Sequence, residues 1–225
     1  MKLLLTGCEY AGKTTLAAQI MAWAEQTIGA TAHFHDHHTI PSTELSPEAQ
    51  ESLLALHPQA KEMFQRFMIE YHVRSAPYSR PDHNLMAPFI EEAVYAPLYY
   101  GYGGENSAAP ARSPAGQRSE MARRMEQRIL DVAPDVVLVL LKASPAVIRR
   151  RMREHPHPHP VVREQDVEYV LQRFEDEVAA SLVQKRIVLD TSSATVEETL
   201  AEFVAANEPF LTNADLLRMR QDKAE

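Results

Sequence analysis

The chain has 225 residues, of which 45% are hydrophobic and 24% charged, and its formal net charge is −8. This length suits one α/β domain, or a core domain with an insertion, and the composition is sufficient for a buried core. The negative charge argues against a general nucleic-acid-binding protein, and the single cysteine excludes a disulfide framework. No stretch resembles a signal peptide or has the length of a transmembrane helix, so we expect a cytoplasmic protein without nucleic-acid or membrane partners.

The first 35 residues predict a strand, a helix and a second strand. The apolar run 2–6 is typical of a buried strand, and the pattern over 13–28 favours a helix that ends at Gly29. A second strand is expected over 30–35. Consecutive strands joined by a helix are usually parallel, so these elements predict a βαβ unit.

The turn between this strand and helix matches the phosphate-binding pattern G-x-x-x-x-G-K-[ST]. Its glycines allow backbone N–H groups to surround a phosphate, and the following helix presents its positive end to the same anion. Lys13 would reach the β- and γ-phosphates, and the Thr14 hydroxyl would bind Mg²⁺. The alternative is a strand–helix turn that binds nothing. We assign nucleotide binding to Gly7, Cys8, Glu9, Tyr10, Ala11, Gly12, Lys13, Thr14 and Thr15.

The middle of the chain is less regular. Residues 47–73 predict helix, broken near His57-Pro58, and 84–90 predict a third strand. Residues 99–116 contain glycines, prolines and small residues, which predict a loop.

The last third again alternates strands and helices. Residues 135–141 form an unbroken apolar run, typical of a strand covered on both faces, and a helix beginning at Ser144-Pro145 follows to about Glu154. A final strand is predicted over 185–190, followed by an amphipathic helix over 195–206.

The residues after these strands argue against two large nucleotide-binding classes. A GTPase would show an Asn-Lys-x-Asp motif after a strand, but the strand 135–141 is followed by Lys142-Ala143-Ser144. A motor-type ATPase would show a strand ending in Asp; Asp190 does so, but late in the chain, where a final structural strand is expected.

A kinase for a small acceptor needs a mobile, arginine-rich lid that excludes water and neutralises the transferred phosphoryl group. Residues 149–163 predict such a lid, with Arg151 and Arg153 the best candidates to contact phosphate. The alternative is a solvated basic helix face.

These motifs, in this order, resemble those of the thymidylate kinases and deoxynucleoside kinases. The resemblance covers 2–40 and 135–207, and only the phosphate-binding pattern is specific. We therefore expect a three-layer, doubly wound α/β domain over 1–225, with a parallel sheet of about five strands, a helical insertion at 41–77 and a lid at 149–163.

In these families an acid at the end of the second strand serves as base or orients the acceptor, and the resemblance places Asp36 there. A cap or turn residue is the alternative. The families also carry an acid–arginine pair after the third strand, whereas this chain has Glu91-Glu92 with no arginine beside them. These glutamates would orient the acceptor or the metal, or else lie at a solvated helix start.

Several further residue types carry weaker signals. Cys8 lies near a helix N-terminus, which can lower a thiol pKa, and Tyr99–Tyr102 are candidates either for the acceptor pocket or for the core. The histidines form two clusters that could in principle bind a metal, but no cysteine accompanies them. These clusters are His33, His35, His37 and His38, and His155, His157 and His159.

The sequence thus predicts ATP- and Mg²⁺-dependent phosphoryl transfer to a small acceptor, a nucleoside or nucleotide first. Lys13, Asp36, Arg151 and Arg153 are the expected catalytic residues. A nucleotide-binding switch with slow hydrolysis and a kinase of a non-nucleotide acceptor remain alternatives. The sequence leaves the acceptor and the oligomeric state, including a homodimer, undecided.

Overall fold

The protein is described by a computed structural model that covers residues 1–30, 34–35, 45–103 and 117–221. The sheet is parallel throughout, with strand order β2-β3-β1-β4-β5. Its strands are β1 (Lys2–Gly7), β2 (Phe34–His35), β3 (His83–Met86), β4 (Val137–Lys142) and β5 (Arg186–Asp190).

The central strands lie at the core because both of their faces are covered. Leu3, Leu4 and Leu5 of β1 are fully buried, so the side chains on both faces of this strand are removed from water. Leu4 is in register with Leu85 of β3 and Leu138 of β4.

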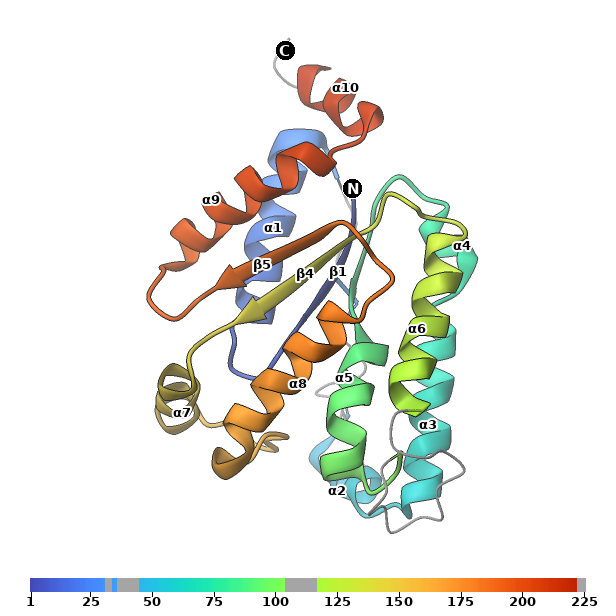
Figure 1. Ribbon diagram of the computed structural model, residues 1–225, viewed down its shortest axis with the longest axis vertical. Helices are drawn as coiled ribbons and strands as arrows, with labels where there is room; N and C mark the ends of the chain where they lie inside the picture. The colour runs from blue at the N-terminus through green and yellow to red at the C-terminus, as the bar shows by residue number, and fades with distance from the viewer. Residues whose placement is uncertain (31–33, 36–44, 104–116, 222–225) are drawn as a thin grey trace.

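Helices cover both faces of the sheet. On one face α1 packs against α9, and on the other α5 packs against α8, while α6 contacts α5 from the side away from α8 (Figure 1). The helices are α1 (Lys13–Ile28), α2 (Pro47–Leu54), α3 (Pro58–His72), α4 (Ser75–Tyr78), α5 (Pro88–Tyr95), α6 (Gln117–Leu130), α7 (Pro145–Glu154), α8 (Val167–Ala179), α9 (Val196–Asn207) and α10 (Asn213–Gln221), with shorter helical turns at Ala96–Tyr100, Glu164–Asp166 and Glu208–Phe210. The expected three-layer, doubly wound α/β fold is confirmed.

Local capping explains why several helices begin and end where the sequence predicts. Gly29 ends α1 with a φ of 58°, a conformation that glycine adopts without strain. The Ser144 hydroxyl caps α7, and Thr195 and Glu198 form a reciprocal capping box at the start of α9.

Two predicted strands and one predicted loop need correction. The third strand ends at Met86 rather than at residue 90, because Pro88 begins α5. The second strand comprises Phe34–His35, and Ala30 lies outside it. Tyr99 and Tyr100 belong to a helical turn, so the expected loop cannot begin at residue 99.

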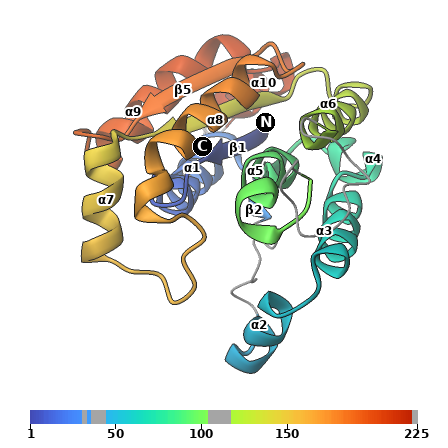
Figure 2. The same cartoon turned by 60° about the horizontal axis from the view of Figure 1, so that its bottom comes forward.

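The structure describes most of the predicted insertion and all of the predicted lid. Helices α2, α3 and α4 fall in the chain between β2 and β3, and all but Tyr78, the last residue of α4, belong to the predicted insertion (Figure 2). Helix α7 continues to Glu154, so the predicted lid begins inside a helix and only 155–163 is irregular. We call residues 155–163 the lid segment.

Helix α10, which the sequence pattern does not reveal, is held by buried charges. The amino group of Met1 lies 2.6 Å from Asp82 Oδ1 and 2.9 Å from Asp215 Oδ1, and Arg218 pairs with both carboxylates. Hydrogen bonds from this amino group and from Thr212 outweigh the effect of burial and lower the pKa of Asp215.

Within the residues described, no helix is long and apolar enough to span a membrane.

Candidate functional site

The phosphate loop, residues 7–14, leaves β1 at the carboxyl edge of the sheet. Gly7 has a φ of 148°, and a Cβ atom there would lie 2.2 Å from the Leu141 carbonyl oxygen, so the close approach to β4 requires glycine. Gly12 has a φ of 94° at the start of α1. Tyr10 also has a positive φ, 66°, a backbone conformation that few residues other than glycine adopt.

Hydrogen bonds from three other elements fix the backbone of this loop. The Glu9 N–H donates to the Tyr95 hydroxyl of α5 at 2.9 Å. The Ala11 carbonyl accepts from the Thr191 hydroxyl, which follows β5, at 2.9 Å. The Tyr10 carbonyl accepts from Arg151 of α7 at 2.9 Å. The loop is therefore preorganised by the tertiary structure around it.

Lys13 lies at the centre of the loop. Its Nζ donates to the Gly7 carbonyl at 2.6 Å and lies 2.7 Å from Glu91 Oε1. The ring of Phe174 lies below, with its centroid 6.0 Å from the same nitrogen. Because Glu91 is 5% exposed, the lysine charge is balanced by a carboxylate that is almost removed from water.

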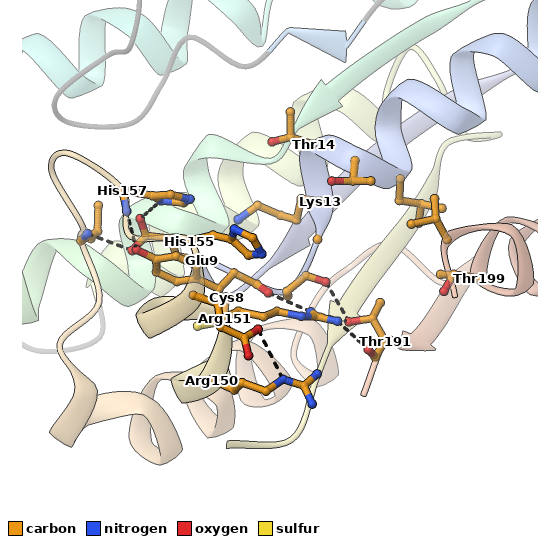
Figure 3. A pocket seen from close by; sticks show the side chains of 18 of the residues that line it. Cys8, Glu9, Lys13, Thr14, Arg150, Arg151, His155, His157, Thr191 and Thr199 are labelled. Atoms are coloured by element: carbon orange, nitrogen blue, oxygen red, sulfur yellow. Dashed lines mark hydrogen bonds and ion pairs between the residues drawn. The ribbon is translucent and has the colours of Figure 1, made fainter. Parts of the chain in front are cut away.

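A cavity of about 810 Å³ opens above this lysine (Figure 3). The predicted nucleotide-binding residues line it, except Gly7, which is the last residue of β1. Thr14 and Thr15 are exposed in the first turn of α1. The other lining residues come from α1, α2, α5, α7, the lid segment, the connection after β5 and α9. They are Leu16, Gln50, Glu91, Arg150, Arg151, Glu154, His155, His157, Pro158, His159, Val161, Thr191, Ala194, Thr195, Val196 and Thr199.

The two predicted lid arginines lie in different environments. Arg151 lines the cavity and donates to the Thr191 carbonyl at 2.7 Å as well as to the phosphate loop. Burial, with a smaller contribution from Arg150, lowers the pKa of Arg151. Arg153 does not line the cavity: its side chain is 64% exposed and lies 2.9 Å from Glu164. Arg150 is the second α7 arginine at the cavity wall, which differs from the prediction.

The structure describes the two glutamates of α5 but not the predicted base. Asp36 lies outside the described residues. Glu91 faces Lys13, whereas Glu92 is 1% exposed and accepts from the Tyr102 hydroxyl at 3.0 Å and from Arg118 at 3.3 Å. The alternative of a solvated helix start is therefore wrong for both.

Arg118 is the arginine that the sequence does not show beside this acid pair. It lies on α6, is 2% exposed, and bridges Glu92 and Glu62, each at 3.3 Å. Burial raises the pKa of Glu92, although Arg118 and Tyr102 partly offset this effect. No local pattern could identify this contact, because its partners are far apart in the chain.

Cys8 and the tyrosines at 99, 100 and 102 lie in environments that differ from the functional roles considered for them in the sequence. Burial raises the pKa of Cys8 to about 12, because its effect outweighs the opposite effect of the nearby Lys13 charge. The thiol therefore stays protonated, and the expected lowering of its pKa is wrong. Tyr99 donates to Asp166 at 3.1 Å, and Tyr102 belongs to the core. None of Tyr99, Tyr100 and Tyr102 lines the cavity described above.

The second histidine cluster borders the cavity through His155, His157 and His159. In the part of the chain that the structure describes, no group of three His, Cys, Asp or Glu side chains is placed to hold a metal ion. The side chains of the first cluster lie outside that part.

No protein-family model matches the sequence, and no curated protein is significantly similar to it. Among solved structures, the chain is similar to a deoxyadenosine kinase from M. mycoides with bound dATP, with a TM-score of 0.61 and 13% identity, covering 91% of this chain and 98% of that one. The same kinase with bound dCTP gives a TM-score of 0.59 and 14% identity, covering 91% and 97%. The chain has the deoxynucleoside kinase fold.

Proposed function

We propose that the protein transfers a phosphoryl group from ATP to a small acceptor, with a nucleoside or nucleotide as the first candidate. The observation that carries this proposal is the position of Lys13 on the phosphate loop, beneath a cavity of about 810 Å³. This volume is within the range of small-molecule sites, and its polar groups converge on one end. The deoxyadenosine kinases of the same fold support the kinase reading.

The donor phosphates would occupy the phosphate loop. Phosphate oxygens would replace the Glu91 carboxylate and the Gly7 carbonyl as the partners of Lys13. The lysine charge would therefore stay paired when the phosphate binds. The start of α1 offers free N–H groups to the same anion. Thr14, exposed at this helix start, would hold the Mg²⁺ that shields the phosphate charge.

The rest of the donor would lie along the wall formed by Arg151, Thr191 and the start of α9. Arg151 is already held by two elements, so it offers a fixed positive charge beside the phosphates. Arg150 lines the same wall. Positioning and electrostatics would therefore supply most of the rate enhancement.

The acceptor would approach from the side of Glu91 and of Gln50 on α2, which both line the cavity. Once Lys13 binds phosphate, the Glu91 carboxylate is free to orient an acceptor hydroxyl or a metal-bound water. Asp36 stays a predicted base. A sugar or other small alcohol is the alternative acceptor.

The test is ADP formation from ATP and Mg²⁺ in the presence of nucleosides, nucleoside monophosphates, sugars and other small alcohols, each tested separately. We expect one acceptor to stimulate ADP formation, and we expect Lys13→Met and Thr14→Ala to lose at least about a hundredfold of this activity. Lys142→Met is the matched control, since Lys142 lies at the end of the neighbouring strand and pairs with Glu175.

Slow ADP formation that no acceptor changes would contradict the kinase proposal and favour a nucleotide-dependent switch. Failure of ATP to bind at all, with the fold intact by circular dichroism, would contradict both functions. Equal losses in Lys13→Met and Lys142→Met would show that the loop lysine has no special role.

A further inference from the structure

Two variable positions of the phosphate loop carry side chains that contact the lid segment rather than the loop. One oxygen of Glu9, Oε1, lies 2.5 Å from His157 Nδ1 (Figure 3). The other, Oε2, accepts from the backbone N–H groups of Val161 and Val162, both at 2.9 Å. One carboxylate thus engages three donors of the lid segment, and hydrogen bonds to a charged group are the stronger kind.

Tyr10 contacts the same part of the lid segment. Its ring stacks on the His157 ring with 4.2 Å between the centroids and 21° between the planes. The His157 N–H donates to the Tyr10 hydroxyl at 3.1 Å. His157 is thereby held by its backbone, by its ring face and by a ring nitrogen.

The loop side of this contact is rigid. The Glu9 N–H is bound by the Tyr95 hydroxyl, and the Tyr10 carbonyl by Arg151. Tyr95 is 2% exposed, and its ring packs edge-on against Phe174. The lid segment therefore docks on groups whose positions are set by the core.

The composition of the lid segment favours its binding to the phosphate loop in one fixed conformation. Prolines at 156, 158 and 160 fix φ at alternate positions and carry no N–H group. Little conformational freedom is lost on docking, because these residues have little to lose. Val161 and Val162 supply the first two consecutive N–H groups after the prolines, and Glu9 accepts from both.

We propose that Glu9 and Tyr10 are a latch that holds the lid segment closed over the phosphate loop, and that opening of this latch limits nucleotide entry and release. The lid segment also lines the cavity, through residues that include His155, Pro158 and His159, so a nucleotide in the cavity would contact it. The gating half of this proposal rests on the proposed function, whereas the closed lid does not.

The closed lid is tested by hydrogen–deuterium exchange of the protein without nucleotide. We expect Glu9→Ala to speed exchange of the Val161 and Val162 amides by at least about tenfold, the factor expected from losing one hydrogen bond to a charged group. Glu164→Ala is the matched control, since Glu164 follows the lid segment and its side chain pairs with exposed Arg153. Exchange in Glu9→Ala as slow as in Glu164→Ala would overturn the latch.

His157→Ala provides a second variant that does not threaten the fold, because this side chain is 49% exposed. It removes the ring stacking and the side-chain hydrogen bond to Glu9 but keeps the two hydrogen bonds from Val161 and Val162 to Glu9. We expect an exchange rate between those of the wild type and Glu9→Ala. A rate equal to that of the wild type would overturn the role of His157 and Tyr10 in the latch.

Gating is tested by stopped-flow release of a fluorescent ADP analogue from the same variants. We expect release from Glu9→Ala to be about tenfold faster than from the wild type or Glu164→Ala, with entry faster as well. If exchange is faster but release is unchanged, the gating half is overturned. If no variant binds the analogue, the proposed function fails, while the exchange result still decides whether the lid is latched.

Discussion

The two adjacent glutamates of α5 belong to two different regions of the molecule. Glu91 faces the phosphate-loop site, where Lys13 Nζ lies 2.7 Å away at the cavity wall. Glu92 faces a different side of the helix, where it contacts Arg118 and the Tyr102 hydroxyl and does not line the cavity. Successive residues of a helix point in directions about 100° apart, which is enough to separate the two carboxylates.

The difference between these regions lies in whether the charge can change partners. In the function proposed above, an incoming phosphate would replace Glu91 on Lys13, because both residues line the cavity. In the cluster formed by Glu62, Glu92, Tyr102 and Arg118, the partners come from three packed elements and Arg118 is 2% exposed. We therefore expect substitutions in the first region to change ligand binding, and those in the second to change stability.

The largest expected effect is that of Arg118→Met. It leaves Glu92 buried without its cationic partner, which should lower the free energy of unfolding by about 3–5 kcal/mol. Adding Glu92→Gln should recover a large part of this loss, because no buried charge then remains unpaired. Urea denaturation measures both, and Arg124→Met, on the exposed face of the same helix with a side chain 71% exposed, is the control. Equal stability of Arg118→Met and Arg124→Met would contradict the distinction.

A smaller effect separates the two glutamates directly. Glu91→Gln removes the anion that competes with phosphate for Lys13, so ADP without Mg²⁺ should bind about fivefold tighter, or roughly 1 kcal/mol. Glu92→Gln should leave this affinity unchanged. Fluorescence titration of the two variants side by side measures the difference. The comparison fails if Glu92→Gln shifts the affinity as much as Glu91→Gln does.

The smallest expected effect is a pH dependence of stability to which Glu92 contributes. Burial raises its pKa in the folded state above the ordinary value of 4.5. Between these two values the folded protein keeps a proton that the unfolded chain loses, so stability from this group falls as pH rises. The Glu92→Gln variant has no ionisable group at this position and therefore lacks this pH dependence of stability. Denaturation from about pH 4 to about pH 8 should therefore show wild type losing stability relative to the variant as pH rises; a constant difference would contradict it.

The local structure around residues 7–14 could be predicted closely because the residues that determine it are contiguous in the chain. The loop from Gly7 to Thr14 has the expected strand before it and helix after it, since the glycines and the apolar periodicity are local signals. Helix caps at Gly29 and Ser144 were equally local. The third strand was predicted too long because its apolar pattern continues past Pro88 into a buried helix.

What the sequence by itself determined is therefore the α/β alternation and the phosphate loop, since both depend on residues within a few positions of one another. Only the tertiary structure decided which charges meet. It turned Arg151 inward and left Arg153 exposed, paired Glu92 with Arg118, and joined Glu9 to His157 across most of the chain. Such contacts depend on how distant elements pack, and helix periodicity alone does not specify the partner on the other side.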